Sequence, residues 1–312
     1  MAKRVLIIES VHPILKEMLS EKGWECVENY SCSYDELGIL IQEFDGIVLR
    51  SRLPIDAKLV SKPHRIKFVA RSGSGLENID VTACKSNGIE VISSPEGNAD
   101  AVGEFAIMNM LACLNKLIPA NESVHQREWL REEHRGLELN SQTIGIIGYG
   151  PMGKSVAKKL SGFGCKVLAH DKYLSNFSDN YVEEVSLSEL QERATIVSLH
   201  IPLSDETKDY ANNEFFAGFR HNLFFINTSR GNQVDVKALL DAIALGKVIG
   251  AALDVLPFEK SSLEGLNENP LFEVVLNNSK IILSPHVAGW TQESYVKLSS
   301  VLASKILEKF NY

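Results

Sequence analysis

The sequence lacks the cysteine pattern of a disulfide-stabilised or zinc-binding protein. Its five cysteines are scattered, odd in number and without a C-x-x-C pair: Cys26, Cys32, Cys84, Cys113 and Cys165. Such a set excludes a disulfide framework and a structural zinc site, and it is typical of proteins kept reduced in the cytosol. We therefore expect no metal site and a cytoplasmic location.

Long hydrophobic runs are also missing. The beginning, MAKRVLIIES, has a short basic head followed by an apolar run too short for a secretory signal, and it is better explained as a first strand. No segment approaches the roughly 18 apolar residues of a membrane-spanning helix. We expect a chain that neither enters nor binds a membrane.

An excess of positive charge is absent as well. The formal net charge is −8 and the pI is about 5.6. Nucleic-acid binding usually needs a basic face, so the composition gives no support to that function. An acidic protein that binds an anionic substrate must do so with a local group of arginines or lysines.

Short apolar runs alternate with helical segments along most of the chain. Strands are predicted at 4–8, 46–49, 66–70, 89–92, 143–148, 166–170, 194–200, 222–228, 248–255 and 280–286. This alternation predicts an α/β fold with two Rossmann-like domains, each a doubly wound parallel sheet, and a cleft between them.

A change of composition at 93–104, rich in Gly, Pro, Asn and Asp, indicates the domain boundary. A helix follows it, for which Asn98 or Asp100 is a candidate cap. The expected division is a first domain at 1–95, completed by a C-terminal helix at 288–312, and a second domain at 96–287.

A glycine-rich turn follows the strand at 143–148. Gly148 permits a tight turn, Gly150 lets the backbone approach a pyrophosphate, and Gly153 permits close packing of helix on strand. Pro151 suits the first turn of the following helix, whose N-terminus favours an anion. The motif alone is weak evidence, but its position between a strand and a helix predicts a dinucleotide site.

Asp171 ends the next predicted strand, about 20 residues further on, where a ribose-binding carboxylate is expected. A carboxylate accepts hydrogen bonds from the ribose hydroxyls and repels a 2′-phosphate, so NAD is favoured over NADP. Lys172 argues weakly in the other direction. A nucleotide-free turn, with Asp171 as a solvated carboxylate, is the alternative.

Three polar residues follow three successive strands of the second half: Arg230, Glu259 and His286. Ligands of open α/β sheets bind at the carboxyl ends of the strands, so we expect these side chains to meet a substrate. Histidine suits proton transfer at neutral pH, a carboxylate stabilises its protonated form, and a guanidinium grips a substrate carboxylate. Each residue alone also fits a structural role; their order together favours the catalytic interpretation.

The pattern resembles the D-isomer-specific 2-hydroxyacid dehydrogenase family, and within it the phosphoglycerate dehydrogenases. The resemblance covers nearly the whole chain, and its most specific segments are RSGSGLENID (71–80), GYGPMG (148–153) with Asp171, LHIPL (199–203), NTSRG (227–231), AALDVLPFE (251–259) and SPHVAG (284–289). It implies hydride transfer between NAD and carbon 2 of a small D-2-hydroxy acid, with the three residues above as catalytic groups. It also implies a homodimer, with much of the interface supplied by residues 98–140.

The resemblance implies further site residues. The backbone of Ser72, Gly73 and Ser74 would face the substrate carboxylate. Residues expected to line the NAD groove are Gly148, Gly150, Pro151, Met152, Gly153, Asp171, Ile201, Thr207, Thr228, Ser229, Arg230, Asp254, His286 and Gly289.

The sequence departs from the family pattern in a few places. Ala101 and Gly103 stand where the family often has serine and alanine, and Lys260 replaces a proline after Glu259. Because the sequence ends at Tyr312, we expect no regulatory domain and no serine feedback inhibition through one.

Arg50 and Arg52, after an N-terminal strand, resemble a segment of the phosphoglycerate dehydrogenases, and two arginines can bind a phosphate. We therefore expect 3-phosphoglycerate as substrate, in the first step of serine biosynthesis, unless the pair only provides surface or structural charge. Reduction of glyoxylate or hydroxypyruvate is the alternative within the class. A non-catalytic NAD-sensing module is the alternative outside it, and an NADP-linked reductase is disfavoured by Asp171.

Overall fold

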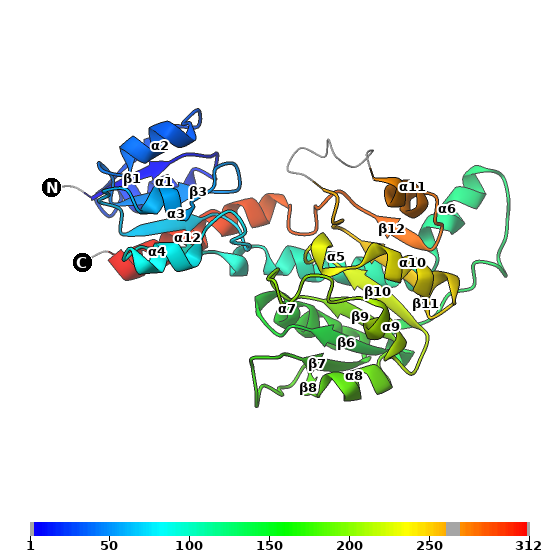
Figure 1. Ribbon diagram of the computed structural model, residues 1–312. Coiled ribbons are helices and arrows are strands. Elements are labelled where there is room, and N and C mark those ends of the chain that lie inside the picture. The colour runs from blue at the N-terminus through cyan, green and yellow to red at the C-terminus, as the bar shows by residue number, and fades with distance from the viewer. Residues whose placement is uncertain (1–2, 260–268, 311–312) are drawn as a thin grey trace. The chain divides into compact units, whose positions relative to one another are not determined.

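The computed structural model describes residues 3–259 and 269–310 and divides into two compact units. Unit 1 comprises Met1–Ala99 and Trp290–Tyr312, and unit 2 comprises Asp100–Gly289. Each unit is built on a parallel sheet covered by helices on both faces, which confirms the predicted α/β class with two doubly wound sheets (Figure 1).

The sheet of unit 1 has five parallel strands in the order β2-β1-β3-β4-β5. Their bounds are β1 Lys3–Ile7, β2 Trp24–Glu28, β3 Gly46–Leu49, β4 Phe68–Arg71 and β5 Glu90–Ser93. The chain leaves β1 toward β2 on one side and later toward β3 on the other. Ligands of such sheets bind at this switch point, beyond the carboxyl ends of the strands.

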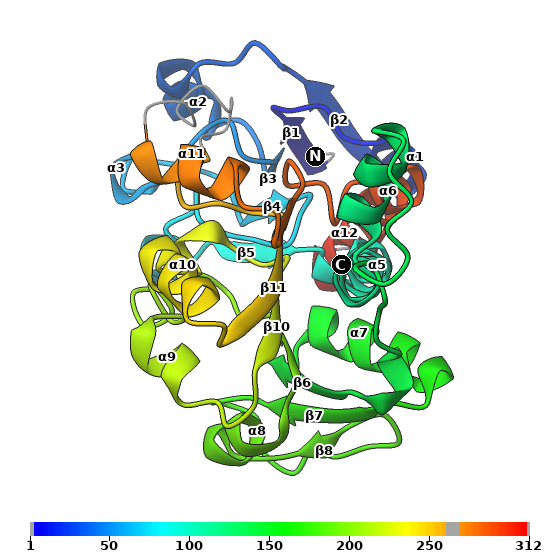
Figure 2. The same ribbon diagram turned by 90° about the vertical axis from the view of Figure 1, so that its right-hand side faces the viewer.

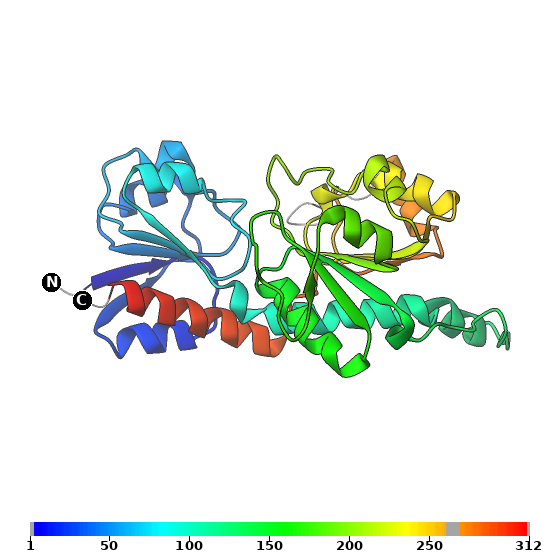
Figure 3. The same ribbon diagram turned by 90° about the horizontal axis from the view of Figure 1, so that it is seen from below.

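Helices cover both faces of the unit 1 sheet (Figure 3). Their bounds are α1 Ile14–Ser20, α2 Tyr34–Leu40, α3 Ala57–Val60, α4 Val81–Ser86, α12 Gln292–Phe310 and the 3-10 turn η1 Pro95–Gly97. Helices α2, α3 and α4 pack on one face through Leu37, Leu59 and Cys84. Helices α1 and α12 pack on the other through residues such as Leu15 and Leu302. The C-terminal helix therefore completes the core of the N-terminal unit.

The sheet of unit 2 has seven parallel strands in the order β12-β11-β10-β9-β6-β7-β8. Their bounds are β6 Thr143–Ile147, β7 Lys166–His170, β8 Glu183–Glu184, β9 Ile196–Leu199, β10 Leu223–Asn227, β11 Val248–Leu253 and β12 Ile281–Leu283. Strands β6 to β11 reproduce the 3-2-1-4-5-6 order of a dinucleotide-binding sheet, and β12 extends it. The switch point lies between β6 and β9.

Two helical layers enclose this sheet, as Figure 2 shows. The bounds are α5 Ala99–Leu114, α6 Leu117–His125, α7 Pro151–Leu160, α8 Leu187–Arg193, α9 Asn213–Ala217, α10 Val236–Ala244 and α11 Pro270–Leu276, with 3-10 turns η2 Leu139–Ser141, η3 Ser161–Phe163 and η4 Gly231–Gln233. Helices α8 to α11 pack on one face around Phe215, Phe216 and Phe225. Helices α5 and α7 pack on the other through Met110 and Val156.

Some elements differ from the sequence prediction. Strand β2 was not predicted because its alternation of polar and apolar residues, WECVE, marks an edge strand rather than a buried run. Strand β8 was not predicted either, because it consists only of Glu183 and Glu184 at the edge of the other sheet. Asp100, one of two candidate caps, lies inside the first turn of α5 and pairs with Lys159 of α7 at 3.3 Å. The polar stretch after residue 116 begins as helix α6.

No single helix within residues 3–259 and 269–310 combines the length and apolar character needed to cross a membrane. Helices α5 and α6 reach those criteria only when counted together, across a bend of 60°.

Candidate active site

The carboxyl ends of three neighbouring strands carry the predicted catalytic residues. Strands β10, β11 and β12 are adjacent, and their last residues Asn227, Leu253 and Leu283 are in register. The segments that follow therefore leave the sheet at one edge. They bring Arg230, Glu259 and His286 to that edge, as their order in the sequence predicts.

His286 and Glu259 form a hydrogen-bonded pair. The imidazole Nδ1 lies 3.0 Å from the carboxylate Oε1. The hydrogen bond that the imidazole donates to Glu259 raises the pKa of His286, and the negative charge of Glu259 adds to that effect, whereas partial burial and the charge of Arg230 oppose it. An ionised Glu259 places the proton on Nδ1 of a neutral imidazole, which leaves Nε2 for a ligand. About half of the imidazole, 49%, is exposed.

The backbone holds His286 in an unusual conformation. Its φ is +55°, in the left-handed region that non-glycine residues rarely adopt. The Asp254 carboxylate accepts hydrogen bonds from Ser284 Oγ at 2.6 Å, Val287 N at 2.9 Å and Ala288 N at 2.8 Å. His286 N donates to the Asp254 carbonyl at 2.8 Å. Asp254 therefore fixes the loop that presents the imidazole.

The sequence did not predict this role of Asp254; its place in the NAD groove, which the resemblance implied, stays a prediction. The side chain is 1% exposed, and both carboxylate oxygens are bonded to the 284–288 loop. Burial raises its pKa against the opposing effect of those hydrogen bonds. The sequence shows only a strand-end aspartate, and nothing in it distinguishes a loop clamp from a ligand contact.

Arg230 lies close enough for its charge to lower the pKa of His286. Its Nη1 donates to the Ser229 carbonyl at 2.7 Å, and its own carbonyl accepts from Asn227 Nδ2 at 3.0 Å. The next residue explains how two loops approach so closely. A Cβ on Gly231 would lie 2.0 Å from the carbonyl carbon of Leu256, in the segment that leads to Glu259. Glycine at 231 therefore allows the segment carrying the guanidinium to pack on the segment carrying the carboxylate.

The glycine-rich turn lies at the switch point after β6. Gly148 has a φ of +93°, which requires glycine. A Cβ on Gly153 would lie 2.1 Å from the Gly148 carbonyl oxygen, whereas a Cβ on Gly150 would meet nothing within 4 Å. Pro151 is the first residue of α7. The turn thus leaves open space in front of a helix N-terminus, which fits a pyrophosphate.

Asp171 follows β7 at the same edge. Its carboxylate accepts hydrogen bonds from Tyr149 N at 2.8 Å, Tyr173 N at 2.9 Å and Leu174 N at 3.1 Å. Burial raises its pKa, but these three donors outweigh that effect and the pKa lies below its ordinary value. The group is therefore an ionised acceptor beside the glycine-rich turn, as a ribose site requires.

Lys172 points to an acidic partner. Its Nζ forms an ion pair with Glu206, and the Tyr173 hydroxyl donates a hydrogen bond to the same carboxylate. Glu206 comes from the segment after β9. Its charge offsets that of Lys172, which removes the main sequence argument for a 2′-phosphate site.

Other predicted cofactor residues line the ends of β9 and β10. Ser229 Oγ donates to the Ile201 carbonyl at 2.6 Å, and Thr207 Oγ1 donates to the Pro202 carbonyl at 2.7 Å. The buried hydroxyl of Thr228 has no partner among the described residues, which fits a polar ligand group at that position. The remaining predicted residues lie in the first turn of α7 and after the histidine loop: Met152 and Gly289. The set fits a dinucleotide.

The two arginines that were predicted to bind a phosphate, Arg50 and Arg52, have different partners in unit 1. Arg52 donates from its guanidinium to the carbonyls of Cys32 at 2.8 Å and Ile8 at 2.9 Å. It therefore supports the fold of unit 1, and its predicted role in binding a substrate phosphate stays a prediction. Arg50 lies with its guanidinium 4.6 Å from the ring centre of Trp290.

The predicted backbone donors at 72–74 are partly used within unit 1. Ser72 N donates to the Leu49 carbonyl at 2.9 Å and Gly73 N to the Arg71 carbonyl at 3.0 Å. Ser74 N donates to no protein acceptor within the described residues. Arg71, which the sequence analysis did not single out, donates from Nε to the Arg50 carbonyl at 2.8 Å. A charged residue ending β4 was the signal available for it.

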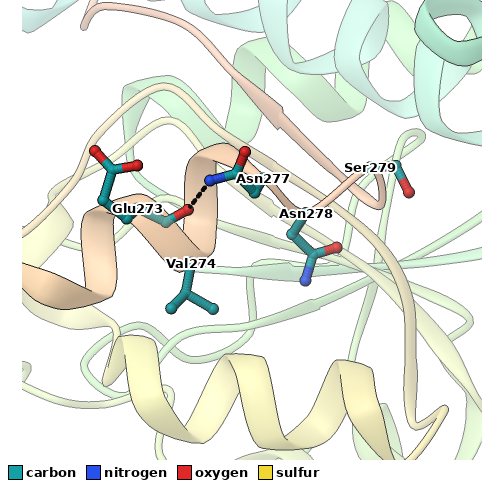
Figure 4. Close-up of a pocket in the computed structure, with 5 residues that line it drawn as sticks. All are labelled: Glu273, Val274, Asn277, Asn278 and Ser279. Atoms are coloured by element: carbon teal, nitrogen blue, oxygen red, sulfur yellow. Dashed lines mark hydrogen bonds between the residues drawn. The ribbon is translucent and has the colours of Figure 1, made fainter.

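Two surface hollows of about 550 Å³ each lie in unit 2. One is lined by Glu273, Val274, Asn277, Asn278 and Ser279 at the end of α11, where Asn277 Nδ2 donates to the Glu273 carbonyl at 2.8 Å (Figure 4). It shares no residue with the predicted site. The other borders Asp171 and residues 176–189. In the described part of the chain, no three His, Cys, Asp or Glu side chains are grouped as metal ligands.

Comparison with known proteins gives consistent results. A family model described as "D-isomer specific 2-hydroxyacid dehydrogenase, NAD binding domain" matches residues 107–288. The chain is 34% identical to a hydroxypyruvate reductase of Thermotoga maritima over 88% of each chain. It is 31% identical to a D-3-phosphoglycerate dehydrogenase of Archaeoglobus fulgidus, over 97% of this chain and 56% of that protein. The chain thus spans about half the length of the phosphoglycerate dehydrogenases it matches.

Solved structures extend the similarity to the whole fold. A D-2-hydroxyisocaproate dehydrogenase has a TM-score of 0.83 and 27% identity, with coverage of 99% of this chain and 96% of that one. A D-lactate dehydrogenase of Aquifex aeolicus, complexed with NAD and lactic acid, has a TM-score of 0.80 and 25% identity, with the same coverage.

Proposed function

Because the chain belongs to the D-isomer-specific 2-hydroxyacid dehydrogenase family, a family of NAD-linked oxidoreductases, we propose that it interconverts 3-phosphoglycerate and its 2-keto acid. The catalytic assignment rests on the hydrogen-bonded pair of His286 and Glu259. The pair lies at the edge of the sheet to which the segment after β10 brings Arg230. This reaction is the first step of serine biosynthesis.

The residues divide the chemistry among them. NAD, when bound at the glycine-rich turn and Asp171, supplies hydride transfer at carbon 2. His286 Nε2 takes the proton of the substrate hydroxyl during oxidation and returns it during reduction. Glu259 holds the ring and stabilises the imidazolium. Arg230 binds the substrate carboxylate through two parallel hydrogen bonds.

Arg50 supports a phosphorylated substrate. Its guanidinium lies beyond the carboxyl end of β3 in unit 1 and, within the described residues, makes no side-chain hydrogen bond or ion pair. Such a group suits a phosphate. Relatives named D-3-phosphoglycerate dehydrogenase, aligned over nearly all of this chain, support the same choice.

A second candidate is reduction of hydroxypyruvate. It is supported by the Thermotoga maritima relative, which the chain matches over 88% of both lengths, a fuller match than the 56% of the phosphoglycerate dehydrogenase. Hydroxypyruvate has the same carbon skeleton without the phosphate, so the two candidates differ only in the group that Arg50 would bind.

A small substrate panel tests the proposal. Purified protein is assayed with NADH or NADPH against phosphohydroxypyruvate, hydroxypyruvate, glyoxylate and pyruvate. The proposal expects the highest kcat/KM with NADH and phosphohydroxypyruvate. Higher efficiency with hydroxypyruvate favours the second candidate. Binding of NADH without turnover of any keto acid would identify a non-catalytic sensing module instead.

Glu259→Gln should change the pH dependence of the reaction. Reduction needs a protonated His286, and Glu259 raises its pKa, so wild-type reduction persists to higher pH than an ordinary histidine would allow. Without the carboxylate, the descending limb of kcat/KM for reduction moves to lower pH. The ascending limb for oxidation, which needs neutral His286, moves in the same direction. Profiles measured in both directions check this, and unchanged limbs would remove Glu259 from the relay.

Glu206→Gln should weaken the preference for NADH over NADPH. The substitution removes the negative partner of Lys172, so the lysine ammonium can then attract a 2′-phosphate. Because exposed charges contribute little, the ratio of NADPH to NADH dissociation constants should fall by up to about fivefold. Fluorescence titration measures it. The control is Asp205→Asn, which removes a charge from the adjacent residue; an equal change there would show a non-specific effect.

The proposal includes a homodimer in the cytoplasm. Apolar side chains of α5, α6 and the following loop are exposed in unit 2: Met108, Leu117, Ile118, Val124 and Trp129, the last at 76%. Figure 1 shows α6 and its loop extending beyond the rest of unit 2. Such a patch suits a subunit interface. Light scattering should give twice the chain mass, and Trp129→Glu should favour the monomer.

The five free cysteines suit a reducing compartment.

A further inference from the structure

Trp290 is an exposed tryptophan with one face occupied. The side chain of Arg50 stacks on it, with the guanidinium carbon 4.6 Å from the ring centre. The residue as a whole is nevertheless 55% exposed, which is unusual for so large an apolar group. A guanidinium stacked in this way keeps its N–H donors in its own plane, directed away from the ring, so they stay available to an anion.

The Glu9 side chain fixes the backbone around Arg50. The Glu9 carboxylate accepts hydrogen bonds from Arg50 N at 2.9 Å, Ser51 N at 3.1 Å and Arg52 N at 3.0 Å. Arg52 ties the same turn to the carbonyls of Ile8 and Cys32. The turn therefore has a fixed geometry before any ligand binds. Only the long side chain of Arg50 needs a further partner to define its direction.

Trp290 has its own support in unit 1. Its ring lies 6.4 Å from that of Tyr295, and Tyr295 meets His12 edge to face at 5.4 Å. Thr291 and Ser294 cap the start of α12 reciprocally, with Ser294 Oγ accepting from Thr291 N at 2.9 Å and Thr291 Oγ1 accepting from Ser294 N at 3.0 Å. The indole is thus flanked by Tyr295 on one side of the chain and by the capped start of α12.

The pair lies at a position where a ligand is expected. Glu9 follows β1 and Arg50 follows β3, the two strands that flank the switch point of the unit 1 sheet. A turn fixed by Glu9, a stacked guanidinium and the indole that precedes α12 meet there. Their chemistry suits a small dianion rather than an apolar substituent, because the guanidinium provides charge and planar donors.

We propose that Trp290 is a positioning residue that orients Arg50, and that this pair makes the enzyme select 2-keto acids with a second anionic group, such as a phosphate on carbon 3. The inference rests on the proposed function. Trp290 acts on the anion through Arg50, and its removal lets the guanidinium take many directions, which weakens the ion pair without removing the charge.

Trp290→Leu, compared with Trp290→Phe, tests the inference. A cation–π contact contributes enough that Trp290→Leu should raise KM for phosphohydroxypyruvate about tenfold, while kcat/KM for hydroxypyruvate stays within about twofold. Trp290→Phe, which keeps a ring, should recover much of the loss. In the double variant with Arg50→Ala, the leucine should add nothing further. Phe163→Leu, another exposed aromatic residue, is the matched control.

A binding measurement separates this inference from the proposed function. 3-Phosphoglycerate should change tryptophan fluorescence in a saturable way in the wild type. The change should be lost in Arg50→Ala because binding is lost, and in Trp290→Phe because the reporting indole is absent, which assigns the signal to Trp290. If the wild type turns over no keto acid, the proposed function fails, but this titration still tests the pair. If turnover is present and Trp290→Leu affects both substrates equally, or if losses are additive with Arg50→Ala, the inference is wrong and the substrate proposal stands.

Discussion

Replacing His286 by alanine should lower kcat for reduction of the 2-keto acid by about 1,000-fold, within the range of general acid catalysis. The imidazole is the group placed by the β12 loop, bonded to Glu259 at 3.0 Å, with Nε2 left for the substrate. Without the imidazole, the His286–Glu259 pair can no longer deliver a proton to the carbonyl oxygen of the keto acid as hydride is transferred to carbon 2. Stopped-flow or steady-state measurement of NADH oxidation gives the loss.

Binding of NADH should survive this change. The glycine-rich turn, Asp171 and the Thr228 region are separate from the imidazole ring, so the NADH dissociation constant should stay within about twofold. His221→Ala is the control, because His221 is exposed in the turn before β10. Full activity of His286→Ala would remove the proton-transfer role; loss of NADH binding together with activity would instead indicate a disrupted fold.

Replacing Arg230 by glutamine should lower kcat/KM by about 100- to 1,000-fold, since two charge-assisted hydrogen bonds to the substrate carboxylate contribute about 3–4 kcal/mol together. The segment after β10 is held by Asn227, whose amide donates to the Arg230 carbonyl at 3.0 Å. The change therefore removes a charge and a fork of donors without removing the backbone support. Steady-state kinetics with varied keto acid measures it.

Arg230→Lys distinguishes charge from shape. Lysine keeps the positive charge but cannot make two parallel hydrogen bonds, so it should recover only a small part of the loss. Arg230 also lowers the pKa of His286. In Arg230→Gln, the limb of the reduction profile that reports His286 should therefore move to higher pH. Equal activity of the lysine variant and the wild type would show that only charge matters.

Six of the seven strands of the unit 2 sheet could be predicted from the sequence because they are largely buried, whereas the two-residue edge strand β8 could not. Runs such as TIGII and LFFIN are continuous and apolar, and the residues that follow them are polar or glycine. Strand β2 was missed because it lies at an edge, where one side chain in two faces solvent. Register then explains why residues about 28 positions apart, Arg230, Glu259 and His286, reach one edge.

Contacts beyond the strand ends could not be predicted in the same way. Arg50 and Arg52 are alike in sequence, yet one stacks on Trp290 and the other bonds two carbonyls of its own unit. Asp254 was predicted only as a residue of the NAD groove, and the structure shows that it clamps the histidine loop. Such roles depend on which partners the fold brings near, and those partners are distant in sequence. Lys260, which replaces the family's proline after Glu259, lies outside the described residues.

The packing of α12 has a consequence for synthesis of the protein. The face of the first sheet that carries Val5, Val48 and Phe68 is covered by Leu302 and Ile306 of that helix. On the ribosome, those strands emerge while the 190 residues of the second unit (100–289) are still to be translated. The dinucleotide-binding unit can therefore fold first, during translation. The first sheet, made earlier, leaves this apolar face exposed to solvent until α12 has been synthesised and packs on it. Chaperone protection during that interval should matter most for the part of the chain that is made first.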